Sequence, residues 1–89
     1  MKKVTKEFIV GRIYANSLDP HRATYFEFVK IDFAMGGIYF KYVGGVDCYF
    51  QNEDGLIGFI YPLLNARYLL SKKEVSKLQE DGIIKLQKL

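Results

Sequence analysis

The chain of 89 residues is long enough for one compact domain over residues 1–89 and too short for several. Hydrophobic residues make up 49% and charged residues 26%, as in a soluble globular protein, while seven Phe, seven Tyr and no Trp favour strands around an aromatic core. A single cysteine excludes an intramolecular disulfide, and the longest nearly apolar run, "GLIGFIYPLL", is too short to span a bilayer, so we expect a cytoplasmic protein without membrane contact.

The net charge of +3 is unevenly distributed along the chain. Residues 1–30 and residues 61–89 each hold six Lys or Arg against three Asp or Glu, whereas residues 31–60 hold one against four. Proteins dedicated to duplex DNA usually carry a denser basic stripe. The pattern therefore weakens a nucleic-acid-binding interpretation without excluding it, and it places an acidic segment in the middle of a mildly basic chain.

Residues 6–15, "KEFIVGRIYA", are predicted to form a first strand with apolar residues on both faces. Ile9 and Ile13 share one face, and the other face holds Phe8, Val10 and Tyr14. Such a strand is typical of a sheet centre, a closed barrel or a surface covered by a second subunit. We therefore predict that Phe8, Val10 and Tyr14 form an interface between copies unless the chain itself covers them.

The stretch "NSLDPHRAT", residues 16–24, contains the single histidine of the chain. Asn, Ser, Asp and Pro together are typical of a turn, because the short polar side chains bond to the backbone and Pro fixes φ. Asp19 and His21 are two residues apart in a loop, a spacing that defines no acid–base geometry, and the sequence positions no nucleophile beside them. If the turn has a role, His21 and Arg22 are predicted to contact an anionic ligand or partner.

Residues 23–33, "ATYFEFVKIDF", are predicted to form a second strand with a bulge near Phe28. The apolar pattern changes face partway: Phe26 and Phe28 lie on one side, and the other holds Val29, Ile31 and Phe33. One extra residue reconciles the two halves and bends the strand.

Residues 37–51, "GIYFKYVGGVDCYFQ", are predicted to form a hairpin that turns at Gly44-Gly45. A two-residue loop would pair Val43 with Val46; a three-residue loop would pair Val43 with Asp47, and we prefer it because it separates polar from apolar side chains better. Its core face then holds Ile38, Phe40, Tyr42, Cys48 and Phe50. Its outer face holds Tyr39, Lys41, Asp47, Tyr49 and Gln51.

After a turn at "NEDG", residues 52–55, a strand is predicted over residues 56–61 and ends at Pro62. Residues 63–70 fit a short strand or a helical turn. Residues 83–88, "IIKLQK", are predicted to form a last strand.

A short helix is predicted over residues 72–81, between Ser71 as N-cap and Gly82 as left-handed C-terminal cap. Ser71 with Glu74 makes a capping box, and Leu70 with Val75 a hydrophobic staple. Its narrow apolar face consists of Val75 and Leu78, and Ile83 is placed to contact Leu78.

These elements predict an α+β fold: a bent, mainly antiparallel sheet of about five to six strands, open or closed into a small barrel, with one short C-terminal helix. Zinc is not expected, because there is no second Cys or His, and no phosphate-binding glycine loop precedes a helix. We expect no metal, no cofactor and no enzymatic activity.

Two classes of function remain. The first is a binding module that acts by protein contact, through self-association or through inhibition or regulation of a partner protein. The second is a nucleotide or single-stranded nucleic-acid binder that uses the aromatic and basic outer hairpin face, Tyr39, Lys41 and Tyr49, with Arg22 as an additional contact.

Overall fold

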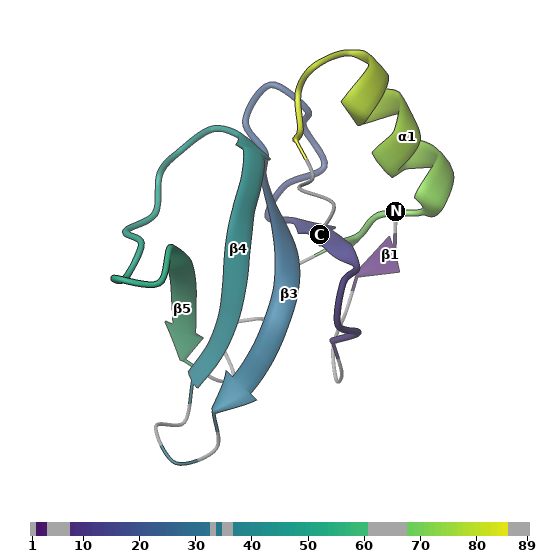
Figure 1. Ribbon diagram of the computed structural model, residues 1–89. Coiled ribbons are helices and arrows are strands. Elements are labelled where there is room, and N and C mark those ends of the chain that lie inside the picture. Colours follow the sequence, from purple (N-terminus) through teal and green to yellow (C-terminus); the bar gives the residue numbers. More distant parts are fainter. Residues whose placement is uncertain (1, 4–7, 33, 35–36, 61–67, 86–89) are drawn as a thin grey trace.

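A computed structural model describes residues 2–3, 8–32, 34, 37–60 and 68–85 of the chain. It shows an antiparallel six-stranded sheet in the order β1-β6-β2-β3-β4-β5 with one helix beside it (Figure 1). The elements are β1 (Lys2–Lys3), β2 (Ile13–Ala15), β3 (Thr24–Asp32), β4 (Gly37–Gly45), β5 (Leu56–Ile60), β6 (Tyr68–Leu69) and α1 (Lys72–Glu80). The predicted α+β fold is confirmed, and within the described residues the sheet is open, with β1 and β5 at its edges, and not a barrel.

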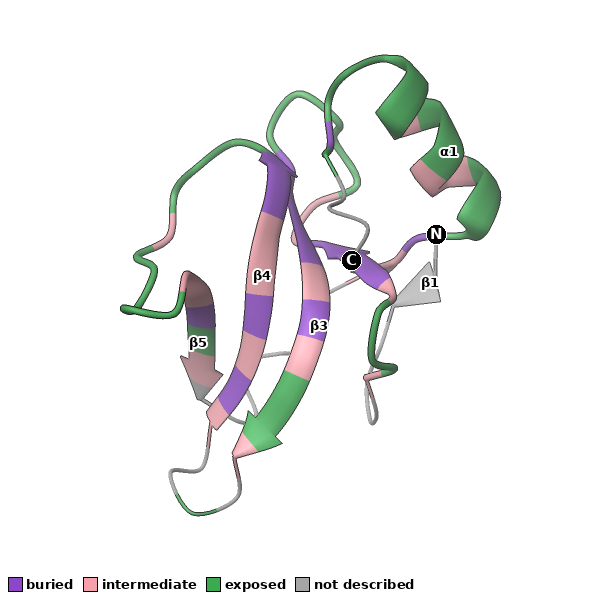
Figure 2. Cartoon of the chain, in the orientation of Figure 1, coloured by how far each residue is buried: buried purple, intermediate pink, exposed green. Residues whose placement is uncertain are grey.

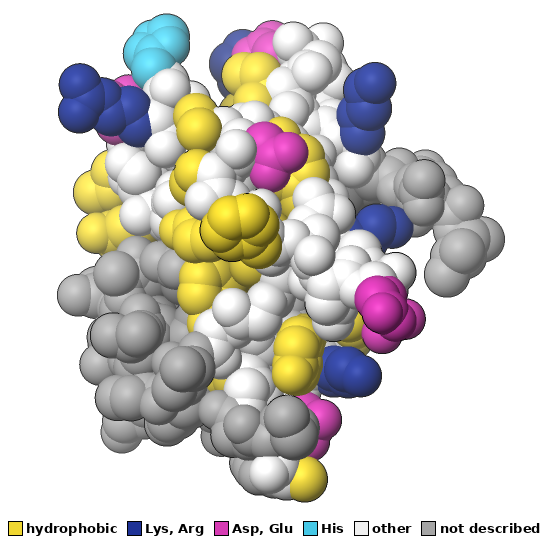
Figure 3. Space-filling model, turned by 90° about the vertical axis from the view of Figure 1, so that its left-hand side faces the viewer, with side chains coloured by type: hydrophobic (Ala, Val, Ile, Leu, Met, Phe, Trp, Pro, Cys, Tyr) yellow, Lys and Arg dark blue, Asp and Glu magenta, His cyan; other side chains and the backbone are white. Residues whose placement is uncertain are grey.

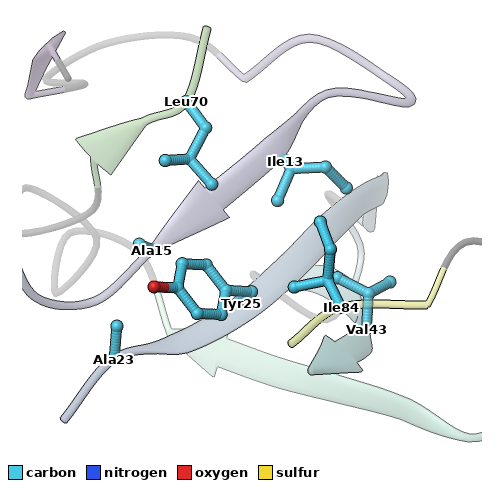
Figure 4. Packing of buried hydrophobic residues seen from close by; sticks show 7 residues of the cluster. All are labelled: Ile13, Ala15, Ala23, Tyr25, Val43, Leu70 and Ile84. Atoms are coloured by element: carbon cyan, nitrogen blue, oxygen red, sulfur yellow. The ribbon is translucent and has the colours of Figure 1, made fainter. Parts of the chain in front are cut away.

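Apolar side chains form two clusters, because successive residues of a strand point to opposite faces of the sheet. Buried and less buried residues accordingly alternate along much of β4 (Figure 2). The helix-side cluster consists of Ile13, Ala15, Ala23, Tyr25, Val43, Leu70 and Ile84, with Val75 and Leu78 of α1 packed against it (Figure 4). The aromatic cluster consists of Tyr14, Phe26, Phe28, Ile38, Phe40 and Ile57, with Phe8, Tyr42, Tyr49, Phe59 and Leu69 packed against it.

The predicted bulge near Phe28 is confirmed. Phe28 pairs with Phe40, but Lys30 pairs with Tyr39, so Val29 is the extra residue on β3. A second irregularity lies where Tyr25 pairs with Gly44 and Phe26 with Tyr42. The long β3–β4 pair is therefore bent at two points, as bulges require.

The predicted first strand over residues 6–15 is wrong in its described part. Only Ile13–Ala15 forms a strand, and a turn precedes it at Gly11, whose φ is +84°. The Arg12 amide donates to the Ile9 carbonyl at 3.1 Å and closes this turn. Gly11 adopts the left-handed conformation readily because it has no Cβ, so the chain reverses where the apolar pattern suggested a continuous strand.

The predicted hairpin turn at Gly44-Gly45 is also wrong, and with it both registers that we considered. The two glycines are the last residues of β4, which pairs with β5 through a longer loop, residues 46–55. Gly44 pairs with Tyr25 on one side and forms a bridge to Ile84 on the other. A Cβ on Gly44 would lie 2.2 Å from the Ile83 carbonyl oxygen, so this glycine permits close approach of two backbones.

The neighbouring turn and strand predictions are confirmed where they are described. Asn52 closes the predicted turn: its carbonyl accepts from the Gly55 amide at 2.9 Å, and its side-chain oxygen accepts from Asp54 and Leu56. The next strand, Leu56–Ile60, follows the turn directly. Residues 61–67, including Pro62 and most of the ambiguous segment, lie outside the described residues.

The C-terminal prediction of a strand over residues 83–88 is only partly covered by the structure. Ile84 forms a single bridge with Gly44, and the Lys85 amide donates to the Val43 carbonyl at 2.8 Å. Residues 86–89 lie outside the described residues. The described part is therefore a bridge to β4 and not a regular strand.

The helix prediction is confirmed together with both of its caps. The Ser71 hydroxyl accepts from the Glu74 amide at 3.1 Å, while the Glu74 carboxylate accepts from the Ser71 amide at 3.0 Å. This last hydrogen bond lowers the pKa of Glu74. At the other end Gly82, with φ +73°, and Ile83 donate backward to the carbonyls of Gln79 and Leu78. Short-range sequence signals thus determine both ends of α1.

We predict that Ser71→Ala lowers the free energy of unfolding by about 1 kcal/mol, because the Glu74 amide loses its acceptor. Ser76→Ala is the matched control: Ser76 lies exposed within the same helix, where Ala is the better helix former. Chemical denaturation of both variants measures the difference. Equal stability of the two variants would contradict the assigned role of the capping box.

Candidate functional site

The loop that joins β4 to β5, residues 46–55, presents apolar side chains to solvent. Val46, Cys48 and Phe50 are exposed, and Phe50 retains 98% of its accessible surface. We call these three residues the loop patch. Figure 3 shows hydrophobic side chains gathered in the middle of the face on this side of the molecule. The loop also carries Asp47, Glu53 and Asp54 and no Lys or Arg.

Tyr49 explains why Phe50 points outward. The Tyr49 ring packs edge-on against Phe26 and Phe59, at centroid distances of 5.4 and 5.2 Å. Its hydroxyl accepts a hydrogen bond from Asn16 Nδ2 at 3.0 Å. Since Tyr49 is held in the aromatic cluster, its neighbour Phe50 is directed into solvent.

Hydrogen bonds hold the beginning of the loop against the start of β3 and the residue before it. The Val46 amide donates to the Ala23 carbonyl at 3.0 Å, and the Thr24 hydroxyl donates to the Val46 carbonyl. Thr24 Oγ1 also lies 3.3 Å from Cys48 Sγ. Together with the Asn52 turn at the far end, these contacts fix the loop at both ends and present Phe50 on a braced support.

Tyr42 adds a further brace just before the loop. Its hydroxyl donates to the Gly45 carbonyl at 2.6 Å. Burial, and after it the nearby charge of Asp47, raises the pKa of Tyr42. Both effects disfavour the phenolate, which is the form that could not donate to this carbonyl.

A groove of about 410 Å³ lies beside the end of β4. It is lined by Lys41, Tyr42, Val43, Gly44, Gly82, Ile83 and Lys85. Val43 and Ile83 make its lining partly apolar, and Lys41 and Lys85 add positive charge. We call it the C-terminal groove.

The structure does not bring the predicted nucleic-acid-binding residues together. Tyr39 and Lys41 lie on one face of β4, but Tyr49 packs with the aromatic cluster on the other face. Gly37 and Gly58 pack against the Tyr39 ring, and Lys30 Nζ lies over it, 5.5 Å from its centre. The platform of Tyr39 and Tyr49 depended on the hairpin and is absent from the described fold.

The stretch around His21 is a turn, as predicted. The His21 amide donates to Asp19 Oδ1 at 3.0 Å, and the Arg22 amide donates to the Asp19 carbonyl at 3.0 Å. Arg22 Nε lies 3.7 Å from Asp19 Oδ2 in an exposed ion pair, which contributes little to stability. His21 and Arg22 are both exposed and accessible to a partner.

The predicted interface of Phe8, Val10 and Tyr14 is divided by the fold. Tyr14 has no exposed surface, and burial raises the pKa of its phenol, which accepts from the Ile9 amide at 2.9 Å. Phe8 packs against Tyr14 at a centroid distance of 5.0 Å. Val10 remains 70% exposed. The chain itself covers Phe8 and Tyr14, so Val10 is the one of the three whose side chain is largely available to a second copy.

The assignment of Cys48 and Phe50 to the core is wrong, and this error concealed the loop patch. The side chains of Cys48 and Phe50 do point away from that of Tyr49, as the predicted alternation required. Because this segment is a loop and not a core strand, however, they point into solvent. Asp47 was the available signal, because Asp is depleted in strands and this residue lies within the predicted second strand of the hairpin.

Comparison of the chain with protein-family models, with curated proteins and with solved structures finds no match. Among the described residues, no group of three or more His, Cys, Asp or Glu side chains is arranged to hold a metal ion. Within the same part of the chain, no helix is long and apolar enough to cross a membrane.

We predict that a thiol reagent labels Cys48 of the native protein at nearly the rate of the unfolded chain, because the side chain is exposed. Labelling kinetics with and without denaturant measure the ratio, and Cys48→Ser supplies the unlabelled control. Native labelling slowed by orders of magnitude would place Cys48 in the interior, where the hairpin hypothesis had put it.

Proposed function

We propose that this protein is a small non-enzymatic binding module that acts by protein–protein contact, through self-association or by regulating a partner protein. The loop patch is its contact surface. The observation that carries the proposal is Phe50, an aromatic side chain 98% exposed on a braced loop. A reducing cytoplasmic setting, which a single unpaired cysteine favours, belongs to the same proposal.

An exposed aromatic residue on a fixed support has the properties of an interface anchor. Burying a Phe removes roughly 150–250 Å² of surface from water, and aromatic anchors supply a large share of the energy of many interfaces. Because Tyr49 and Asn52 already hold the loop, little conformational freedom is lost on binding. The surrounding carboxylates would then orient the partner.

Native mass spectrometry of the chain isolated from its own cells tests this proposal. We predict a mass above that of the monomer, from a second copy or from a partner protein, and its loss in Phe50→Ser. The fold should persist, because Phe50 contributes little to the core. Val10→Ser is the matched control, since Val10 is also exposed but lies in the turn before β2.

Two outcomes would contradict the proposal. One is a monomer alone, in cell-derived and concentrated samples. The other is an assembly that Val10→Ser dissociates and Phe50→Ser leaves intact, which would assign contact to the predicted N-terminal interface.

The alternative proposal, a nucleotide or single-stranded nucleic-acid binder, now rests on Lys30, Tyr39 and Lys41. These residues lie on one face of the β3–β4 pair, since Lys30 pairs with Tyr39 and Lys41 follows two residues later. A base would have to displace the Lys30 ammonium to stack on Tyr39. We therefore rank this function second.

Titration of a short single-stranded oligonucleotide and a nucleotide panel at two salt concentrations separates the two proposals. The protein-contact proposal predicts no detectable affinity. The alternative predicts salt-sensitive binding that Tyr39→Ala removes, because stacking on the ring contributes on the order of 1–3 kcal/mol per base. Tyr49→Ala is unsuitable as a probe, since Tyr49 packs against Phe26 and Phe59.

A further inference from the structure

The loop patch and the C-terminal groove lie along the same edge of β4. One edge of β4 is taken by β3 over its full length. On the other edge, β5 pairs with Gly37–Lys41, while Ile83–Lys85 bonds to Val43–Gly45. The loop, residues 46–55, leaves the end of β4 and returns to β5. The loop that carries Phe50 and the C-terminal groove therefore both adjoin the edge of β4 that faces away from β3.

The two features are complementary in shape and charge. Phe50 projects, and the groove beside the end of β4 offers about 410 Å³. Ile83 lines the groove and is 38% exposed. Around Phe50 the loop carries only acidic charged residues, whereas the groove has Lys41 and Lys85. Because Phe50 is exposed, it does not fill the groove of its own chain.

We propose that two copies of the chain form a symmetric dimer in which Phe50 of each copy enters the C-terminal groove of the other. This inference rests on the proposed function and names its partner. Phe50 packs against Ile83 and Val43 of the second copy, and the loop carboxylates lie near Lys85.

The loop patch and the C-terminal groove adjoin the same edge of β4, and this arrangement allows the assembly to close at two copies. A projection and a recess on opposite sides of a protein link copies head to tail into rings or filaments. A projection and a recess on the same side can be exchanged reciprocally about a two-fold axis, which closes the assembly at two copies. Each contact then occurs twice, so one substitution removes both copies of it.

Sedimentation equilibrium over a concentration series tests the dimer with three variants. Phe50→Ser, which removes the projection, and Lys85→Glu, which reverses a groove charge, should each weaken the dimer about tenfold or more. Val10→Ser should leave the dissociation constant unchanged. Added salt should weaken the wild-type dimer more than the Lys85→Glu dimer, in which attraction has become repulsion. Amide NMR spectra of each variant confirm that the fold is intact.

Isotope-filtered NMR on a mixture of labelled and unlabelled copies tests the contact directly. Intermolecular signals between the Phe50 ring and the Ile83 methyl groups are expected. A dimer without these signals, or one that persists in Phe50→Ser, overturns the inference. A monomer at all concentrations, combined with a Phe50-dependent complex with a different protein, also overturns it while leaving the proposed function intact.

Discussion

The close contact between β4 and the segment after α1 is the constraint on which the architecture depends. Gly44 is placed between Tyr25 and Ile84, and the Ile83 backbone comes so near that a side chain at Gly44 would overlap it. Through this contact Ile84 enters the helix-side cluster, and α1 is held with Val75 and Leu78 against the sheet. The same contact makes one wall of the C-terminal groove, so the feature that completes the core also shapes the candidate binding surface.

On the opposite face of the sheet, Tyr49 couples the aromatic cluster to the loop patch. The rings of Phe26, Phe59 and Tyr49 contact one another edge to face, an arrangement that aromatic quadrupoles favour. Packing in the core therefore holds Tyr49 in place. The side chain of the next residue, Phe50, points the other way and is exposed as a result. A site built in this way is anchored to the core through Tyr49, although it lies on a loop.

The features that could be predicted from the sequence are those determined by near neighbours. The helix caps depend on Ser71, Glu74 and Gly82 within one short segment, and the bulge at Val29 follows from the change in the apolar pattern of one strand. The Gly44-Gly45 pair could not be interpreted correctly in this way, because its role comes from Ile83 and Ile84, far along the chain. A glycine pair between two apolar runs fits a tight hairpin and a close backbone approach equally well. Choosing the hairpin turned Cys48 and Phe50 inward and set Tyr49 beside Tyr39, so one error about a long-range contact displaced the predicted site.

The fold places the acidic and basic segments of the chain at different positions on the surface. Three of the four carboxylates in residues 31–60 lie in the loop that carries Phe50, and Lys85 lines the C-terminal groove beside the end of β4. Charges on such exposed side chains are screened beyond about 8 Å at physiological salt, so they act only once two surfaces are near contact. In the proposed complex they would orient the partner, whereas the bulk of the affinity would come from burial of Phe50, because exposed ion pairs contribute little. Under the same proposal, neutralising a loop carboxylate without changing its size should change specificity and salt dependence, whereas loss of the Phe50 ring should weaken binding far more.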